Sequence, residues 1–457
     1  MTLKCLTLAT LGLLALTARP LSAQGGRGGG GAGGRIAYDT FSLANGLRVV
    51  YSEDHSTPIV SVDVWYHVGS RDERPGRSGF AHLFEHMMFQ GSAHVGKTEH
   101  MKLVERAGGD VNGSTAEDRT NYYQTVPSNR LNLALWLEAD RMRSLAITQE
   151  NFENQRETVK EERRLRIDNQ PYSVAFIDGL TWAFDSTACF AYAHTVIGSM
   201  DDLNAAKLPD VQAFFDTYYV PNNAVLVVVG DFVPTDLRRL VGQYFGAIPR
   251  RDAPPSVACQ YRLSPGPTTR ELQDRLATLP AALRFYRVPP HNHADTHALE
   301  LLNVILGQGE SSRLNVGVVR RAQAAVGTQL AMNPFGSRRG PGAVVVLGVA
   351  NQGVDVLRMD SLIAAQVDSV RRHGITPEEL EKAKNVLRGG LTNNRETTIS
   401  KAEELHHYFM FHDGLGEINT DLDRFLAVTA EDVRRVAATY LAPENALRVI
   451  VRPGGGQ

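Results

Sequence analysis

The sequence predicts an α+β fold of two similar domains, each a mainly antiparallel sheet packed with helices. Three observations carry this prediction. Short strand patterns alternate with longer helical patterns along the 457 residues. A proline-rich stretch at 250–268 interrupts them and is typical of a linker. Finally, a group of residues from the first half recurs in the second half at one constant spacing, which indicates an internal duplication.

The recurring residues belong to a helix end, a turn and a strand. Each residue of the second set follows its counterpart by 222 positions, as Asn445 follows Asn223. The sets are Asp210-Val211, Thr217-Tyr218, Pro221, Asn223-Ala224 and Val227-Val228-Val229, then Asp432-Val433, Thr439-Tyr440, Pro443, Asn445-Ala446 and Val449-Ile450-Val451. The alternative is a coincidence between two common helix-to-strand turns. We expect domains at 36–249 and 269–457, joined by the linker.

Within the first domain, the elements follow from periodicity. The segment 59–68 (IVSVDVWYHV) alternates as a half-buried strand does, and 41–51 ends in a largely apolar strand. Further strands are expected at 121–126 and 225–229, and helices at 79–89, 129–145 and 150–168.

The first residues have the layout of an export signal. Lys4 precedes an apolar run from Leu6 to Leu16, and Leu21-Ser22-Ala23 is a small-residue cleavage site. This predicts a signal peptide at 1–23, too short to span a bilayer of about 30 Å; an uncleaved amphipathic anchor is the alternative. A glycine-rich flexible tether follows at 24–35. We expect no membrane span after leader cleavage, and export across the inner membrane to the periplasm.

Composition excludes several classes of protein. The 48 basic and 50 acidic residues give a formal net charge of −2, which offers no broad attraction for nucleic acid. Three cysteines are too few for a disulfide scaffold or a four-cysteine zinc site. Cys189 and Cys259 remain after leader removal and could pair in an oxidising compartment, but the sequence does not fix the distance between them.

The segment His82-Leu83-Phe84-Glu85-His86 lies inside a helical pattern. Its histidines are therefore at positions i and i+4, one above the other on one helix face. This spacing lets two imidazole nitrogens reach one Zn²⁺ at about 2.0–2.1 Å. Glu85 lies close enough to contact a water at the metal without being a ligand. A third protein ligand is needed, with one position left open.

The helix expected at 150–168 offers that ligand. Phe152, Val159 and Leu165 mark its apolar face, and Glu162 lies three residues from both Val159 and Leu165. Glu162 is therefore predicted to point inward, and Glu161 toward solvent. A buried carboxylate needs a partner because an isolated buried charge is very costly, and a zinc ion would be that partner.

Other histidines have ordinary structural interpretations. The cluster His291, His293 and His297 follows two prolines, which favours a solvated turn over a metal site. His406-His407 lies on a polar helix and is expected at the surface. His194 could line a cleft, but a structural role is favoured.

At these residues the sequence resembles the pitrilysin/insulinase family of zinc peptidases, and in particular its bacterial branch, similar to the mitochondrial processing peptidase subunits. The His-x-x-Glu-His order is the inverzincin motif. The matching passages are GFAHLFEHMMFQGS, DVNGSTAEDRTNYYQTVP, TVKEERR, VIGSMDDL and YYVPNNAVLVVVGD. The resemblance implies a metalloendopeptidase or oligopeptidase that hydrolyses extended or unfolded peptides, with one zinc per chain. It implies His82, His86 and Glu162 as metal ligands and Glu85 as general base.

The resemblance also implies a substrate strand and a partner. Asp110 to Thr115 matches the family's substrate-binding strand, which makes Asn112, Gly113 and Ser114 candidate substrate contacts; a plain hairpin turn at Asn-Gly is the other interpretation. Family members often close two such chains, or two such halves, around a peptide chamber. We therefore expect a homodimer, or a heterodimer with a related subunit.

Two departures from the family pattern limit what it implies. Gln155 stands where many relatives carry a second glutamate, so no catalytic role is assigned to it. The strand 342–350 (GAVVVLGVA) lacks the arginine and tyrosine with which partner halves grip substrate carbonyls, so the expected partner is an Arg/Tyr-bearing subunit. The stretch 299–309 (LELLNVILGQG) contains no histidine, so the second domain is expected to be zinc-free. The competing function is a non-catalytic assembly or processing-complex subunit of the same fold.

Overall fold

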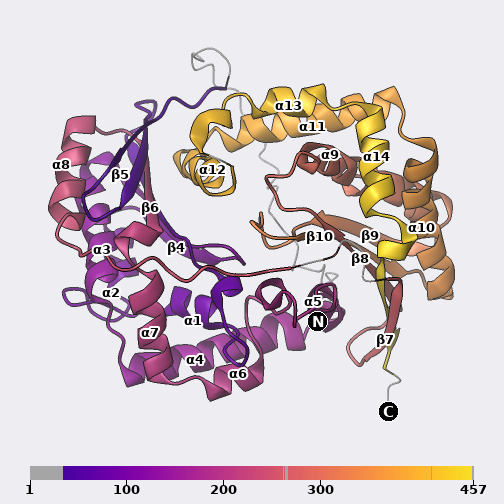
Figure 1. The fold of residues 1–457 in the computed structure, drawn as a ribbon, viewed down its shortest axis with the longest axis horizontal. Coiled ribbons are helices and arrows are strands. Elements are labelled where there is room, and N and C mark those ends of the chain that lie inside the picture. The colour runs from indigo at the N-terminus through magenta and orange to yellow at the C-terminus, as the bar shows by residue number, and fades with distance from the viewer. Residues whose placement is uncertain (1–33, 261, 263–265, 413, 455–457) are drawn as a thin grey trace, which may run out of the picture.

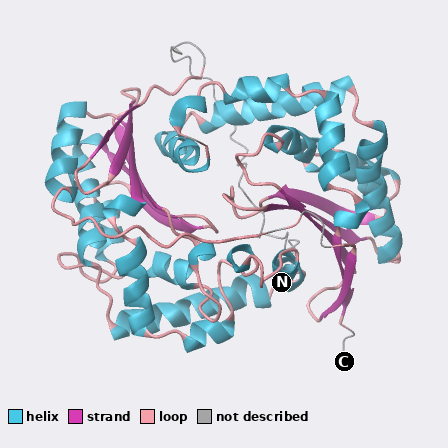
Figure 2. Cartoon of the chain, in the orientation of Figure 1, coloured by secondary structure: helices cyan, strands magenta, loops and turns pink. Residues whose placement is uncertain are grey.

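The computed structural model describes residues 34–260, 262, 266–412 and 414–454. The predicted signal peptide at 1–23 and most of the tether at 24–35 lie outside these residues. The described chain forms two β-sheets, one from each half of the sequence, with helices packed against both (Figures 1 and 2). The α+β class with two similar domains is therefore confirmed.

The elements follow in two parallel series. The first half contains β1 (Asp39–Ser42), β2 (Arg48–Glu53), β3 (Ile59–Tyr66), α1 (Phe80–Met87), α2 (Glu99–Arg106), β4 (Asp110–Thr115), β5 (Thr120–Pro127), α3 (Leu131–Ser144), α4 (Gln149–Arg163), α5 (Ser173–Trp182), α6 (Met200–Ala205), α7 (Leu208–Tyr218), β6 (Ala224–Gly230) and α8 (Pro234–Phe245). The second half contains β7 (Thr268–Asp274), β8 (Ala281–Val288), α9 (Thr296–Gly307), β9 (Ala325–Met332), β10 (Gly342–Ala350), α10 (Val356–His373), α11 (Pro377–Asn394), α12 (Thr398–Phe411), α13 (Asp421–Ala427), α14 (Ala430–Tyr440) and β11 (Leu447–Pro453).

The two sheets share one strand topology. The first has the order β1-β2-β6-β3-β5-β4 and the second the order β7-β11-β8-β10-β9. Leaving out β1, each sheet has one parallel pair, β2 with β6 and β7 with β11, and its other pairs are antiparallel. Strand β4 lies at one edge of the first sheet, and among the described residues β5 is its only strand neighbour.

The repeated turn has the same hydrogen bond in both halves. The Asn223 side-chain amide donates to the Tyr218 carbonyl oxygen at 2.9 Å, and that of Asn445 donates to Tyr440 at 3.2 Å. In both places the asparagine joins a helix end to the following strand, β6 or β11. An amide that satisfies a carbonyl at a helix C-terminus fixes the exit of the chain, so the repeated asparagine has one structural role in both halves.

Each sheet is covered on one face by a helix that the other half of the chain supplies. Helix α12, yellow in Figure 1, packs against β3 and β6 of the first sheet. Helix α5 packs against β8 and β11 of the second sheet. The buried residues at the first contact include Ala402, Leu405, Tyr408, Val50, Val225, Val227 and Val229. Those at the second include Phe176, Ile177, Leu180, Leu283, Phe285, Val345 and Val449. Helices α5 and α12 thus each pack on the sheet of the other half, and both contacts are apolar.

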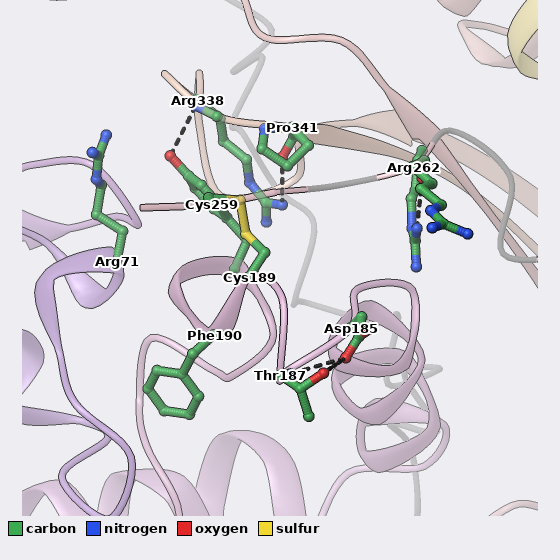
Figure 3. The surroundings of a disulfide bond; sticks show 12 residues. Arg71, Asp185, Thr187, Cys189, Phe190, Cys259, Arg262, Arg338 and Pro341 are labelled. Carbon is green, nitrogen blue, oxygen red and sulfur yellow. Dashed lines mark hydrogen bonds between the residues drawn. A yellow bond between two sulfur atoms is a disulfide. The ribbon is translucent and has the colours of Figure 1, made fainter. Parts of the chain in front are cut away.

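A disulfide fixes the connection between the two halves. Cys189 and Cys259 are bonded, with their Cα atoms 4.3 Å apart (Figure 3). Beside the bond, the backbone N–H of Gln260 donates to the Ala188 carbonyl oxygen at 3.0 Å. The described residues between α8 and β7 form no helix or strand, and the disulfide attaches this stretch to the segment that follows α5.

Two local predictions in the first half were wrong. Leu165 is 57 % exposed, although Phe152 and Val159 are buried as expected. The α-helical turn gives way to a wider π-helical turn at 164–168, which changes the angular spacing of the side chains. The hairpin turn is not at Asn112-Gly113: both residues are paired inside β4, opposite Tyr123 and Tyr122, because the chain reverses at 116–119 instead.

The histidine predictions also need correction. His406 is 1 % exposed and stacks on Trp65 with ring centroids 4.8 Å apart, and His407 is half-buried. Neither is a surface residue, because α12 lies between the two halves. His293 is exposed in a turn as expected, whereas His291 and His297 are half-buried. Among the described residues, no helix is long and apolar enough to cross a membrane.

Candidate metal centre

The helix that carries the two candidate histidines is held at its N-terminus. Gly79 precedes α1 with φ 88°, and a Cβ there would lie 2.7 Å from the Ile197 carbonyl oxygen, so glycine is required. The buried Glu73 carboxylate accepts the backbone N–H groups of Gly79 and Ala81, both at 2.8 Å. A carboxylate is favourable here because the first N–H groups of a helix have no partner within it.

The structure brings together the three predicted ligands. His82 and His86 lie on the same face of α1, with ring centroids 4.8 Å apart. Glu162 Oε2, from α4, lies 3.6 Å from His82 Nε2 and 3.2 Å from His86 Nε2. Two ligand atoms on one tetrahedral zinc ion, each at about 2.0–2.1 Å, are about 3.3 Å apart. The two imidazoles and the carboxylate therefore fit a zinc ion in both donor chemistry and spacing.

The charges at this cluster suit a cation. Burial lowers the pKa of His82 to about 4, so its imidazole is neutral at pH 7. The hydrogen bond from His86 is the main cause that lowers the pKa of Glu162 to about 2, so this carboxylate is ionised. Arg166 contacts the other oxygen, Oε1, at 3.0 Å and leaves Oε2 facing the histidines.

Glu85 lies on the same helix, but its partners come from β4. Its Oε2 accepts a hydrogen bond from the Thr115 hydroxyl at 2.5 Å. A Cβ on Gly113 would lie 3.2 Å from Glu85 Cγ, so glycine at this position leaves room for the carboxylate. Burial raises the pKa of Glu85, while the Thr115 hydrogen bond and the charges of His86 and Arg119 oppose this shift. A carboxylate with a raised pKa is suited to accept and return a proton.

The three candidate substrate contacts have different surroundings. Asn112 is exposed on β4, and its side-chain oxygen accepts the Gly113 N–H at 2.8 Å. Gly113 lies under Glu85. The Ser114 hydroxyl instead donates to Asn121 at 2.7 Å, within the sheet. Gln155, on α4, is buried and donates to the neighbouring Asn154 at 2.7 Å.

Sequence reasoning missed four residues of this region: Glu73, Thr115, Arg119 and Arg166. Arg119 donates to the Ser114 carbonyl oxygen at 2.9 Å and lies over the Trp65 ring, so it stiffens β4. Arg166 is four residues from Glu162 on a helix, a spacing that the sequence does display. Glu73 has no sequence signal, because its partners are backbone groups. His194 contacts Glu73 at 3.0 Å, which confirms its structural role.

The chain has two α+β domains of one topology, and the first carries the histidine and glutamate cluster. Both features are those of a metallopeptidase. Residues 48–177 match the family model described as Insulinase (Peptidase family M16), and residues 205–387 match Peptidase M16 inactive domain. The chain belongs to peptidase family M16.

Three similar proteins place the chain within the family. The zinc protease PqqE of Helicobacter pylori is 30 % identical over 91 % of this chain and 93 % of its own length. A crystal structure of a protease from Helicobacter pylori superposes with a TM-score of 0.87 and 29 % identity, covering 92 % of this chain and all of that one. A probable mitochondrial-processing peptidase subunit beta of Arabidopsis thaliana is 24 % identical over 88 % of this chain and 75 % of its own length.

Proposed function

We propose that this protein is a zinc-dependent endopeptidase that hydrolyses extended or unfolded peptides. His82, His86 and Glu162 hold one zinc ion per chain, and Glu85 is the general base. The observation that carries the proposal is the approach of Glu162 Oε2 to both histidine Nε2 atoms, at 3.6 and 3.2 Å. The relative named zinc protease PqqE supports the same activity.

The side chains have separate roles in this mechanism. A zinc ion, when bound, supplies Lewis acidity and lowers the pKa of a coordinated water to about 7. Glu85 accepts the proton of the attacking water and returns it to the leaving amine. Thr115 holds the Glu85 carboxylate in place through the 2.5 Å hydrogen bond, and burial of the site makes the carboxylate a stronger base.

Strand β4 is the proposed docking edge for the substrate backbone. In the part of the chain that the structure describes, it has a strand neighbour on one side only, and Gly113 on it lies directly beside Glu85. An extended peptide that pairs with β4 would present its backbone next to the proposed base. This makes Asn112, Gly113 and Ser114 the strand positions nearest the substrate, with recognition through backbone groups and little dependence on side chains.

The test of this function uses two glutamates of α4 and one of α1. In Glu85→Gln we expect zinc to be retained and hydrolysis of an unstructured peptide to fall by about 10²–10⁴-fold, the usual contribution of a general base. In Glu162→Gln, zinc content itself should fall. Glu161→Gln is the matched control, because Glu161 is 59 % exposed beside the ligand and should leave both properties unchanged.

The alternative is a non-catalytic subunit of the same fold. A wild-type chain that binds zinc and hydrolyses no peptide, alone or with a related subunit, would contradict the proposed enzyme. Metal content and hydrolysis are therefore measured on the same samples.

We also propose that a second, related subunit completes the substrate chamber. Two features support this: the strand β10 contains neither arginine nor tyrosine, and the Arabidopsis relative is named as a subunit. Full hydrolysis of long peptides by a purified homodimer would contradict the need for a different partner.

The proposed location is the periplasm, after removal of residues 1–23. The Cys189–Cys259 disulfide supports export, because disulfides persist in oxidising compartments and are rare in the cytosol. Mass spectrometry of the protein recovered from the periplasmic fraction of its source cells checks both points: the mature chain should begin at Gln24.

A further inference from the structure

Three histidines of the second half, far in sequence from the candidate metal centre, lie close together where helix α12 ends beside the loop after β8. His407 lies in the last turns of α12, His412 directly follows that helix, and His291 lies in the loop after β8. The Nε2 atoms of His291 and His407 are 3.1 Å apart. One ring nitrogen from each of the three lies within 4.8 Å of the other two. The spacing of the closest pair is that of two ligands on one tetrahedral ion, about 3.3 Å.

The tautomer of His412 is set by a carboxylate. Its Nδ1 contacts Glu417 Oε2 at 3.0 Å, and Glu417 is in turn held by Arg424 at 2.7 Å. A histidine that donates from Nδ1 to a carboxylate has its lone pair on Nε2, directed away from that carboxylate. This arrangement is typical of metal-ligating histidines, whose second nitrogen almost always has such a partner.

The cluster is accessible to an ion. His291 and His412 line an open pocket of about 530 Å³, and all three histidines are half-buried. The pocket is therefore a route for the ion, and leaves space for a water as a fourth ligand. Since the three ligand atoms are all imidazole nitrogens, Zn²⁺, Cu²⁺ and Ni²⁺ are favoured over Mg²⁺ or Ca²⁺, which prefer oxygen ligands.

We propose that His291, His407 and His412 bind a second divalent transition-metal ion, which joins the loop after β8 to helix α12. All three ligands come from the second half of the chain. Because α12 packs on the first sheet and β8 belongs to the second, the ion would fix the end of this helix to the second domain. The role is structural: the site lies on residues that the proposed peptidase mechanism does not use.

Metal counting on the full-length chain tests the site. The protein is stripped with a chelator, exposed to a modest excess of ZnCl₂, separated from free metal and analysed by mass spectrometry. The wild type should bind about two zinc ions per chain. His82→Ala weakens the candidate centre on α1, so this variant should bind about one, at the proposed second site. Adding His412→Ala or His291→Ala should remove the remaining ion.

The matched control is His293→Ala, two residues from His291 and exposed. It should leave the zinc count unchanged. Circular dichroism establishes that each variant is folded, and Co²⁺ loaded in place of zinc gives a second measurement. The visible bands of four-coordinate Co²⁺ should persist in His82→Ala and disappear when His412→Ala is added.

Two results would overturn the proposal: no zinc bound by the folded His82→Ala chain, or equal zinc in that chain with and without His412→Ala. The test is independent of the proposed peptidase. If only the candidate centre on α1 fails to bind, the wild type and His82→Ala hold the same single ion, which His412→Ala removes.

Discussion

At the scale of single residues, Glu73 holds the start of α1, the helix that carries both candidate histidines. Its side chain accepts the N–H groups of residues six and eight positions later, at the start of α1, and His194 also contacts it. His82 directly follows Ala81, whose N–H donates to Glu73. An altered start of the helix would therefore shift both candidate histidines relative to Glu162.

We predict that Glu73→Ala weakens zinc binding by about 10–100-fold, the range typical when a group that supports a metal ligand is removed. The residue does not contact the metal, so the effect acts through the orientation of α1. A chelator-competition titration measures the affinity. Glu73→Gln, which keeps an acceptor oxygen, should lose less.

Glu150→Ala serves as the control, because this glutamate is 84 % exposed. Its zinc affinity should equal that of the wild type. An unchanged affinity in Glu73→Ala would show that the ligands position themselves without the helix N-terminus being held.

At the scale of elements, the disulfide constrains a stretch of chain with no helix or strand of its own in the described residues. It closes a loop of 70 residues that includes α6, α7, β6 and α8. A cross-link of this kind stabilises mainly by restricting the unfolded chain, and typically contributes about 2–4 kcal/mol. The stretch between α8 and β7 is thus tethered to the first half.

We predict that the double variant Cys189→Ala/Cys259→Ala loses about 2–4 kcal/mol of unfolding free energy in urea denaturation. Wild-type protein measured with a reductant should shift to the same midpoint, and the double variant should not respond to the reductant. Equal midpoints for oxidised wild type and the double variant would mean that the bond constrains little of the unfolded chain.

At the scale of the whole molecule, the exchanged helices make each half depend on the other. Without α12, the apolar face of β6 would be exposed to water, and without α5 the same would hold for β8. Burial of apolar surface is the main favourable contribution to folding. The two halves should therefore unfold together, although separate domains often do not.

We predict a single calorimetric transition, with calorimetric and van't Hoff enthalpies in agreement. Leu405→Ala, in the buried contact of α12 with the first sheet, should destabilise the protein by about 2–5 kcal/mol and shift this transition as a whole. Two resolved transitions, with only one moved by Leu405→Ala, would show that the halves fold independently.

The spacing of His82, Glu85 and His86 along the chain was sufficient to predict that they share one helix face, because a helix fixes those positions locally. The same holds for the duplicated turn, whose hydrogen bond spans five residues. For Glu162, the buried position Val159 predicted an inward direction, although Leu165, the other position used, is exposed. The distance of Glu162 from the two histidines depended on how α4 packs against α1.

What the sequence by itself determined about this protein is therefore local: two similar α+β units, a histidine pair one helical turn apart, and a glutamate facing inward. Only the tertiary structure decided which distant segments meet. It buried His406, because α12 packs on the first sheet; it brought His407 to His291; it paired Cys189 with Cys259; and it placed Gly113 beside Glu85. The physical reason is that such contacts depend on the burial of apolar faces across the whole chain, which no local pattern encodes.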